Sequence, residues 1–184
     1  MTKIGRPNLA DAPPWYAYFF RLAVGDDLLQ ALQDNKQQTL GLIASIPFSA
    51  ENYRYADGKW TIKQVFIHMI EEERYYAYKA FCYSRRVDVM LEAPPAMDNF
   101  ANNANAVNRT LKDIAEEFGA VRDASIALFK HMTGDMLDFK DLPGDTPYSA
   151  RSLGWMMVGH SVHHCNLVRE RYSAVGSVET DVIN

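Results

Sequence analysis

The chain has 184 residues, of which 48% are hydrophobic and 23% are charged, a balance typical of one globular domain spanning residues 1–184. Its formal net charge is −4 without a run of Lys or Arg, which argues against a nucleic-acid-binding protein, and no apolar run of about 18 residues predicts a membrane span. The two cysteines, Cys82 and Cys165, lie far apart, so we expect reduced thiols and a cytoplasmic protein rather than a disulfide framework.

Proline and glycine divide the chain into segments with helical periodicity, of which four are long. The first covers residues 26–46, where two aspartates open the helix and Pro47 closes it. The second follows Thr61, which has capping-box spacing to Gln64, and it continues without Gly or Pro to about Arg85. Its apolar face is predicted to contain Ile62, Val65, Met69, Tyr76, Ala80 and Tyr83.

A long connector, residues 86–108, follows the second helix and contains two prolines and several asparagines. It is longer than most loops in a compact domain, which indicates a crossover or a segment that covers a site. The third helix is predicted over residues 111–132, with Gly134 just after its end, and the fourth runs from Ser149 to about Tyr172.

The helical periodicity is not accompanied by any sustained strand-like alternation, so we predict an all-α fold. We expect a four-helix bundle with a long crossover connection between the second and third helices. The first 25 residues and the C-terminal tail, residues 173–184, are expected to wrap around the outside of this bundle.

Histidines are concentrated in the fourth helix, where three of the five in the chain lie at positions 160, 163 and 164. His160 and His164 are four residues apart and share one face, so their imidazoles can converge on a single metal ion. His163 is rotated by about 60° from His160, which predicts a position at the edge of the bundle, although an i, i+3 pair can also chelate. The predicted inward-facing stripe contains Leu153, Met157, His160, His164 and either Leu167 or Val168.

A zinc-type site needs at least a third protein ligand, and two histidines outside the fourth helix are available. His131 lies near the end of the third helix, where a polar or cationic group is generally favoured. His68 lies in the middle of the second helix, at the edge of the apolar stripe, and Glu71 and Glu72 follow one turn later. Either acid could orient a metal ligand or act as a base, whereas the simpler alternative is an exposed helical acid.

The pattern around these histidines differs from two known kinds of metal site. Ser161 occupies the position of the catalytic glutamate in an H-E-x-x-H metalloprotease helix. No Glu-x-x-His pair occurs on two helices, which argues against a ferritin-like di-iron centre. Three imidazoles with open positions would instead polarise a bound water or a thiol. Hydrogen-bonded core histidines without a metal are the alternative.

Two stretches carry the most specific pattern in the chain. The first, YRYADGKWTIKQVFIHMIEEERYYAYKAFCYSRR, has Gly-Lys-Trp ahead of a helical histidine, and the second, YSARSLGWMMVGHSVHHCNLVRERY, contains G-H-x-x-H-H. Together they resemble the DinB-like superfamily and, within it, the YfiT-type metal-dependent hydrolases. The resemblance implies a four-helix bundle with a long crossover, in which His68, His160 and His164 hold one divalent ion such as zinc or nickel and His163 is a neighbour. The connector reads PPAMDNF where a Pro-Gly-Phe-Asp-like segment is expected, so the pocket wall is expected to differ.

Some relatives in this superfamily are similar to thiol S-transferases that use bacillithiol, mycothiol or glutathione, and others are labelled hydrolases. The resemblance therefore implies a metal-dependent enzyme that activates a low-molecular-weight thiol or water against a small electrophilic substrate, with Glu72 as the candidate catalytic residue. It is also compatible with a homodimer, although no sequence patch indicates one. A non-catalytic metal- or ligand-binding helical module is the alternative function.

Overall fold

Four long helices form the framework of the computed structural model, which describes residues 3–88, 97–140 and 148–172. Within these ranges all regular secondary structure is helical, which confirms the predicted all-α fold, and none of the described helices combines the length and apolar character needed to cross a bilayer. The long helices are α2 (Leu28–Ser45), α3 (Ile62–Ser84), α5 (Leu111–Phe129) and α7 (Ala150–Arg171). The shorter elements are η1 (Leu9–Asp11), α1 (Tyr16–Leu22), η2 (Phe48–Ala50), α4 (Met97–Asn103), η3 (Ala106–Asn108) and α6 (Gly134–Asp138).

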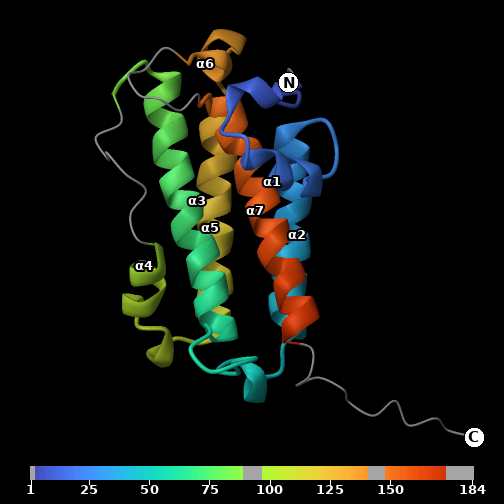
Figure 1. The fold of residues 1–184 in the computed structure, drawn as a ribbon, viewed down its shortest axis with the longest axis vertical. Coiled ribbons are helices and arrows are strands. Elements are labelled where there is room, and N and C mark those ends of the chain that lie inside the picture. The colour runs from blue at the N-terminus through green and yellow to red at the C-terminus, as the bar shows by residue number, and fades with distance from the viewer. Residues whose placement is uncertain (1–2, 89–96, 141–147, 173–184) are drawn as a thin grey trace, which may run out of the picture.

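The four long helices form a bundle in which sequence neighbours are not always neighbours in space. Both α2 and α3 pack against α5 and α7, so α2 and α3 lie diagonally across the bundle. Figure 1 shows α2 and α7 running down the molecule while α3 and α5 run up it. Because α3 and α5 are parallel, the chain between them has to return along the length of the bundle. The predicted crossover between the second and third long helices is therefore confirmed.

Capping boxes begin three of the four long helices. At α3, Thr61 Oγ1 accepts a hydrogen bond from the Gln64 backbone N–H at 3.2 Å, and the Gln64 side chain accepts one from the Thr61 N–H at 2.9 Å, as the spacing predicted. Thr110 and Ser149 begin α5 and α7 in the same way. Because these side chains satisfy backbone donors that a helix start leaves unpaired, the local sequence fixes where the helices begin.

The N-terminal segment contributes to the core, contrary to the expectation that it only wraps around the outside. Tyr16 and Phe20 of α1 are buried, and α1 packs along α7. Arg6 anchors the segment, because its guanidinium donates a hydrogen bond to the Phe20 carbonyl at 2.8 Å and lies 4.5 Å from the centroid of the Trp155 ring. The expected position of the tail, residues 173–184, lies outside the described residues.

Helix α7 is buried along its first half. Every residue from Ala150 to Ser161 except Arg151 is buried, because α1, α2 and α3 all pack around this helix. The predicted inward-facing stripe is confirmed as buried at Leu153, Met157, His160, His164 and Val168. His160 therefore lies where the fully buried part of α7 ends, and His164 is buried one turn later.

The connector between α3 and α5 contains two short elements, α4 and η3, that the sequence did not predict. Helix α4 packs against α3, where Gln64 Nε2 donates to the Ala101 carbonyl at 3.4 Å. Residues 89–96, which include the start of PPAMDNF, lie outside the described ranges. The prediction for Gly134 is wrong, because this residue begins α6 instead of following directly on the end of α5.

Candidate metal centre

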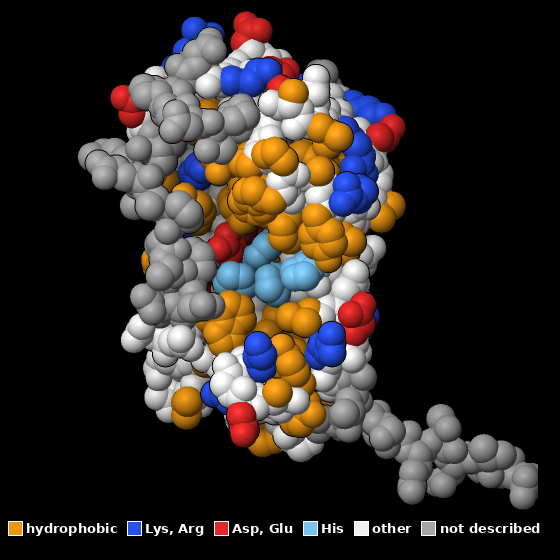
Figure 2. Space-filling model, viewed as in Figure 1, with side chains coloured by type: hydrophobic (Ala, Val, Ile, Leu, Met, Phe, Trp, Pro, Cys, Tyr) orange, Lys and Arg blue, Asp and Glu red, His pale blue; other side chains and the backbone are white. Residues whose placement is uncertain are grey.

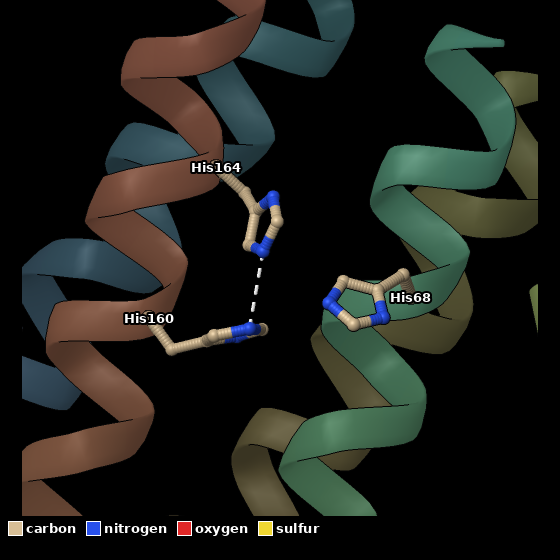
Figure 3. Close-up of side chains that lie close together, drawn as sticks. All are labelled: His68, His160 and His164. Atoms are coloured by element: carbon tan, nitrogen blue, oxygen red, sulfur yellow. Dashed lines mark hydrogen bonds between the residues drawn. The ribbon is translucent and has the colours of Figure 1, made fainter. Parts of the chain in front are cut away.

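Three histidines from two helices converge between α3 and α7. His160 and His164 project from α7 and His68 projects from α3, and their side chains point toward one another (Figure 3). One ring nitrogen from each histidine lies within 4.8 Å of the other two, and the residues are only 6–8% exposed. The structure thus brings together the three residues that the family resemblance indicated.

The spacing within this histidine cluster suits a single ion. The Nε2 atoms of His160 and His164 are 3.1 Å apart and share a hydrogen bond. Two imidazole nitrogens bound to a tetrahedral zinc ion would be about 3.3 Å apart, so only a small adjustment is required. The His68 ring centroid lies 5.1 Å from that of His160 and 4.8 Å from that of His164. Within the described ranges, no fourth His, Cys, Asp or Glu joins the cluster.

The buried environment favours the uncharged imidazoles that a metal ion requires. Burial is the largest cause that holds the pKa of His160 well below its usual range, followed by the neighbouring His164, His68 and His163. Burial, then His68 and His163, lowers the pKa of His164 to about 2. The Nδ1 atom of His164 is buried without a hydrogen-bond partner, a situation that costs about 1–3 kcal/mol. These neutral, crowded nitrogens fit the needs of a divalent cation.

Aromatic side chains surround the histidine cluster. Trp60 packs on His68 with ring centroids 4.7 Å apart, and the rings of Tyr76 and Phe19 both lie 5.9 Å from His160. Figure 2 shows the histidines in a hollow on one face, with hydrophobic side chains above and below and an acidic side chain beside them. The contact between Trp60 and His68 became visible only in the fold.

The two remaining histidines lie outside the cluster. His163 is half-buried beside it, with Nδ1 3.0 Å from the Tyr18 hydroxyl and its ring 5.6 Å from that of Phe19. Burial lowers the pKa of His163, and the charge of Glu170 opposes this effect. His131 is exposed close to the end of α5. His163 therefore has the neighbouring position that its angle on the helix predicted.

Glu72, the candidate catalytic residue, is buried on α3 one turn beyond His68, so it is not the exposed helical acid of the simpler alternative. Burial raises the pKa of Glu72, and a hydrogen bond donated by the Tyr76 hydroxyl lowers it by a smaller amount. A carboxylate with a raised pKa is a better proton acceptor than an ordinary one, which suits a general base. The Glu72 carboxylate is not part of the group of side chains that converge with the three imidazoles.

Glu71 has a different environment, because it lies on α3 beside two arginines and another glutamate. Its Oε2 atom is buried without a hydrogen-bond partner. Burial raises the pKa of Glu71 to about 7, assisted by Glu117 and opposed by Arg74 and Arg109. Because the pKa in the folded state is above that of the unfolded chain, the stability that Glu71 contributes is fully present below about pH 4.5 and is lost as the pH rises through 7.

Replacing Glu71 with glutamine is therefore expected to raise the free energy of unfolding at pH 8 by about 1 kcal/mol. This value allows for the partial exposure of the side chain. At pH 4 the same replacement is expected to change the free energy of unfolding little. Urea denaturation at both pH values measures this difference. Glu116→Gln is the matched control, because Glu116 is an exposed acid on α5. An equal effect of Glu71→Gln at pH 4 and pH 8 would contradict the prediction.

Comparisons with known proteins agree with this architecture. A family model described as the DinB superfamily matches residues 25–168. The chain belongs to the DinB superfamily. The matched region contains α2, α3, α5 and all three converging histidines, so the resemblance seen in the sequence is confirmed.

Among solved structures, YfiT from Bacillus subtilis matches this DinB-superfamily chain with a TM-score of 0.67 and 15% sequence identity, over 92% of each chain. YfiT is described as "a probable metal-dependent hydrolase with an unusual four-helix bundle topology". At this level of identity the match establishes the shared fold. A comparison with curated protein sequences gave no significant match.

Proposed function

We propose that this DinB-superfamily protein is a metal-dependent enzyme that activates a nucleophile, a low-molecular-weight thiol or water, against a small electrophilic substrate. The observation that carries the proposal is the convergence of three buried histidines without a fourth protein donor among the described residues. Catalytic metal sites keep such an open position, whereas structural sites are closed by four protein ligands. When bound, a Zn²⁺ or Ni²⁺ ion would supply Lewis acidity.

The surrounding residues support a catalytic role in this proposal. His68, His160 and His164 would hold the ion, and the aromatic side chains of Trp60 and Tyr76 around them would limit access of bulk water. Glu72 would accept the proton of the nucleophile, with Tyr76 holding its carboxylate by a hydrogen bond. The two cysteines are free and buried, which suits a reducing cytoplasmic setting.

Metal content measured by mass spectrometry tests the metal site. Purified wild type, exposed to mixed divalent ions at low micromolar concentration, is expected to hold about one equivalent of metal. His68→Ala, His160→Ala and His164→Ala are each expected to lose it. His163→Ala is the matched control, because it removes an adjacent imidazole on the same helix that lies outside the cluster. Negligible metal in the wild type, or equal loss in His163→Ala, would overturn the proposal.

The choice between thiol transfer and hydrolysis is tested by activity of the metal-loaded protein. Consumption of 1-chloro-2,4-dinitrobenzene is followed with bacillithiol, mycothiol or glutathione, and hydrolysis of 4-nitrophenyl acetate is followed without a thiol. Glu72→Gln is expected to retain the metal and to slow whichever reaction occurs by about a hundredfold, the usual scale for loss of a general base. Full activity of Glu72→Gln would remove Glu72 from the mechanism.

A further inference from the structure

A continuous polar stripe runs along the inner side of α3, beyond the histidine cluster. Its members recur at three- and four-residue steps and are all buried, although a packed core would favour apolar side chains there. They are His68, Glu72, Tyr76, Lys79 and Tyr83. The proposed function uses the first three and leaves Lys79 without a role.

Lys79 is a buried cation without an anionic partner among the residues that the structure describes. It is 7% exposed, and its Nζ atom lies 3.4 Å from the centroid of the Tyr148 ring and 5.5 Å from that of Tyr75. None of the described ion pairs or hydrogen bonds involves its ammonium group. Burial alone lowers the pKa of Lys79 to about 8, so the amine is still mostly protonated at neutral pH.

The surroundings of Lys79 connect it to the histidine cluster. Tyr148 lies against Tyr16 of α1, with ring centroids 5.7 Å apart, and accepts a hydrogen bond from the Tyr16 hydroxyl. Tyr76, one turn before Lys79 on α3, contacts the His160 ring. Tyrosine side chains therefore lie both at the histidine cluster and at the ammonium group, and all belong to the side of α3 that faces the interior or to residues packed against it.

A buried charge without a counter-ion destabilises a fold, and aromatic faces compensate for only part of that cost. Such a residue is expected where a ligand supplies the missing charge. On the basis of the proposed function, we propose that Lys79 binds the carboxylate of a small-molecule substrate or thiol cofactor whose reacting end lies at His68, His160 and His164. His68 and Lys79 are eleven positions apart, which corresponds to about 16.5 Å along α3, so binding depends on ligand length.

The test uses the full-length, zinc-loaded protein and a series of ω-mercaptocarboxylates with three to eight carbons, each paired with the ω-mercaptoalkanol of equal length. At the best length the carboxylate is expected to bind about tenfold or more tightly than the alcohol in the wild type, as measured by calorimetry. Lys79→Met is expected to abolish that preference and to keep its metal, and to fold at least as stably because a buried charge is removed.

Lys59→Met is the matched control, because Lys59 and Arg54 line a separate cavity of about 390 Å³ beside Trp60 that could also attract a carboxylate. The inference is overturned if no length shows a carboxylate preference in the wild type, if Lys79→Met keeps the preference, or if Lys59→Met loses it instead.

Metal content measured on the same samples separates this inference from the proposed function. If the wild type holds no metal, the proposed function fails. The Lys79 site is then tested on metal-free protein by ¹⁵N NMR of the lysine side chains. The Lys79 signal is the one that is absent from the spectrum of Lys79→Met. A shift of that signal with hexanoate but not with hexanol supports a carboxylate site. An unchanged signal overturns it.

Discussion

Arg122→Ala is expected to lower the free energy of unfolding by about 3–5 kcal/mol, because it leaves a buried carboxylate without its counter-ion. Arg122 is completely buried, and its Nε donates to both carboxylate oxygens of Glu73, at 2.8 and 3.0 Å. Its Nη1 donates to Asn35 Oδ1 at 2.7 Å and to the Leu32 carbonyl at 3.2 Å. One guanidinium from α5 thus connects α2 and α3, which lie diagonally in the bundle.

Urea denaturation measures the effect, and a double-mutant cycle assigns it to the ion pair. Arg122→Met combined with Glu73→Leu is expected to recover most of the stability that either single change removes, because no charge is then left buried. Arg109→Ala is the control, because this arginine pairs with Glu117 at a partly exposed position. A loss of less than about 1 kcal/mol in Arg122→Ala would show that the pair is solvated or dispensable.

Gly159→Ala is expected to destabilise the protein by about 3 kcal/mol and to displace α1 from α7. A Cβ atom at position 159 would lie 2.1 Å from the Phe19 carbonyl oxygen and 2.6 Å from its carbonyl carbon. Both atoms belong to the backbone of α1, so no side-chain rotation can relieve the clash. Because the Phe19 ring packs against His160 and His163, displacement of α1 is also expected to expose the histidine cluster and weaken metal binding.

Limited proteolysis of α1, together with urea denaturation and metal titration, measures these effects. Gly119→Ala is the matched control, because a Cβ atom there meets only Lys36 Cε at 3.7 Å and alanine favours the helical conformation of α5. It is expected to stabilise the protein by up to about 1 kcal/mol. Wild-type stability and protease resistance in Gly159→Ala would contradict the close approach of the two helices.

Much of the candidate site could be predicted from sequence because two of its three histidines are close together on one helix. The i, i+4 spacing of His160 and His164 fixes their common face in any regular helix, and the capping box at Thr61 fixes where α3 begins. The third member, His68, was favoured over His131 by its position in the middle of a long helix, with two glutamates one turn later. The family resemblance indicated the same residue, and the packing of α3 against α7 brings it to the pair.

The residues that surround the cluster could not be predicted in the same way. Phe19 and Tyr18 come from an N-terminal segment that was expected to lie outside the bundle, and their contacts with His160 and His163 depend on α1 packing along α7. The burial of Lys79 likewise depends on Tyr148, which is distant in sequence. Arg122 had no local signal that marked it as the central ion-pair partner.

The sequence by itself determined the helical periods, their capped beginnings and the pair of imidazoles on one helix face, because each depends on residues within a few turns of one another. Only the tertiary structure decided which aromatic rings enclose the three histidines and which charges are buried. These depend on the order in which four helices pack around one another, and side chains far apart in sequence leave no periodic signal of their meeting.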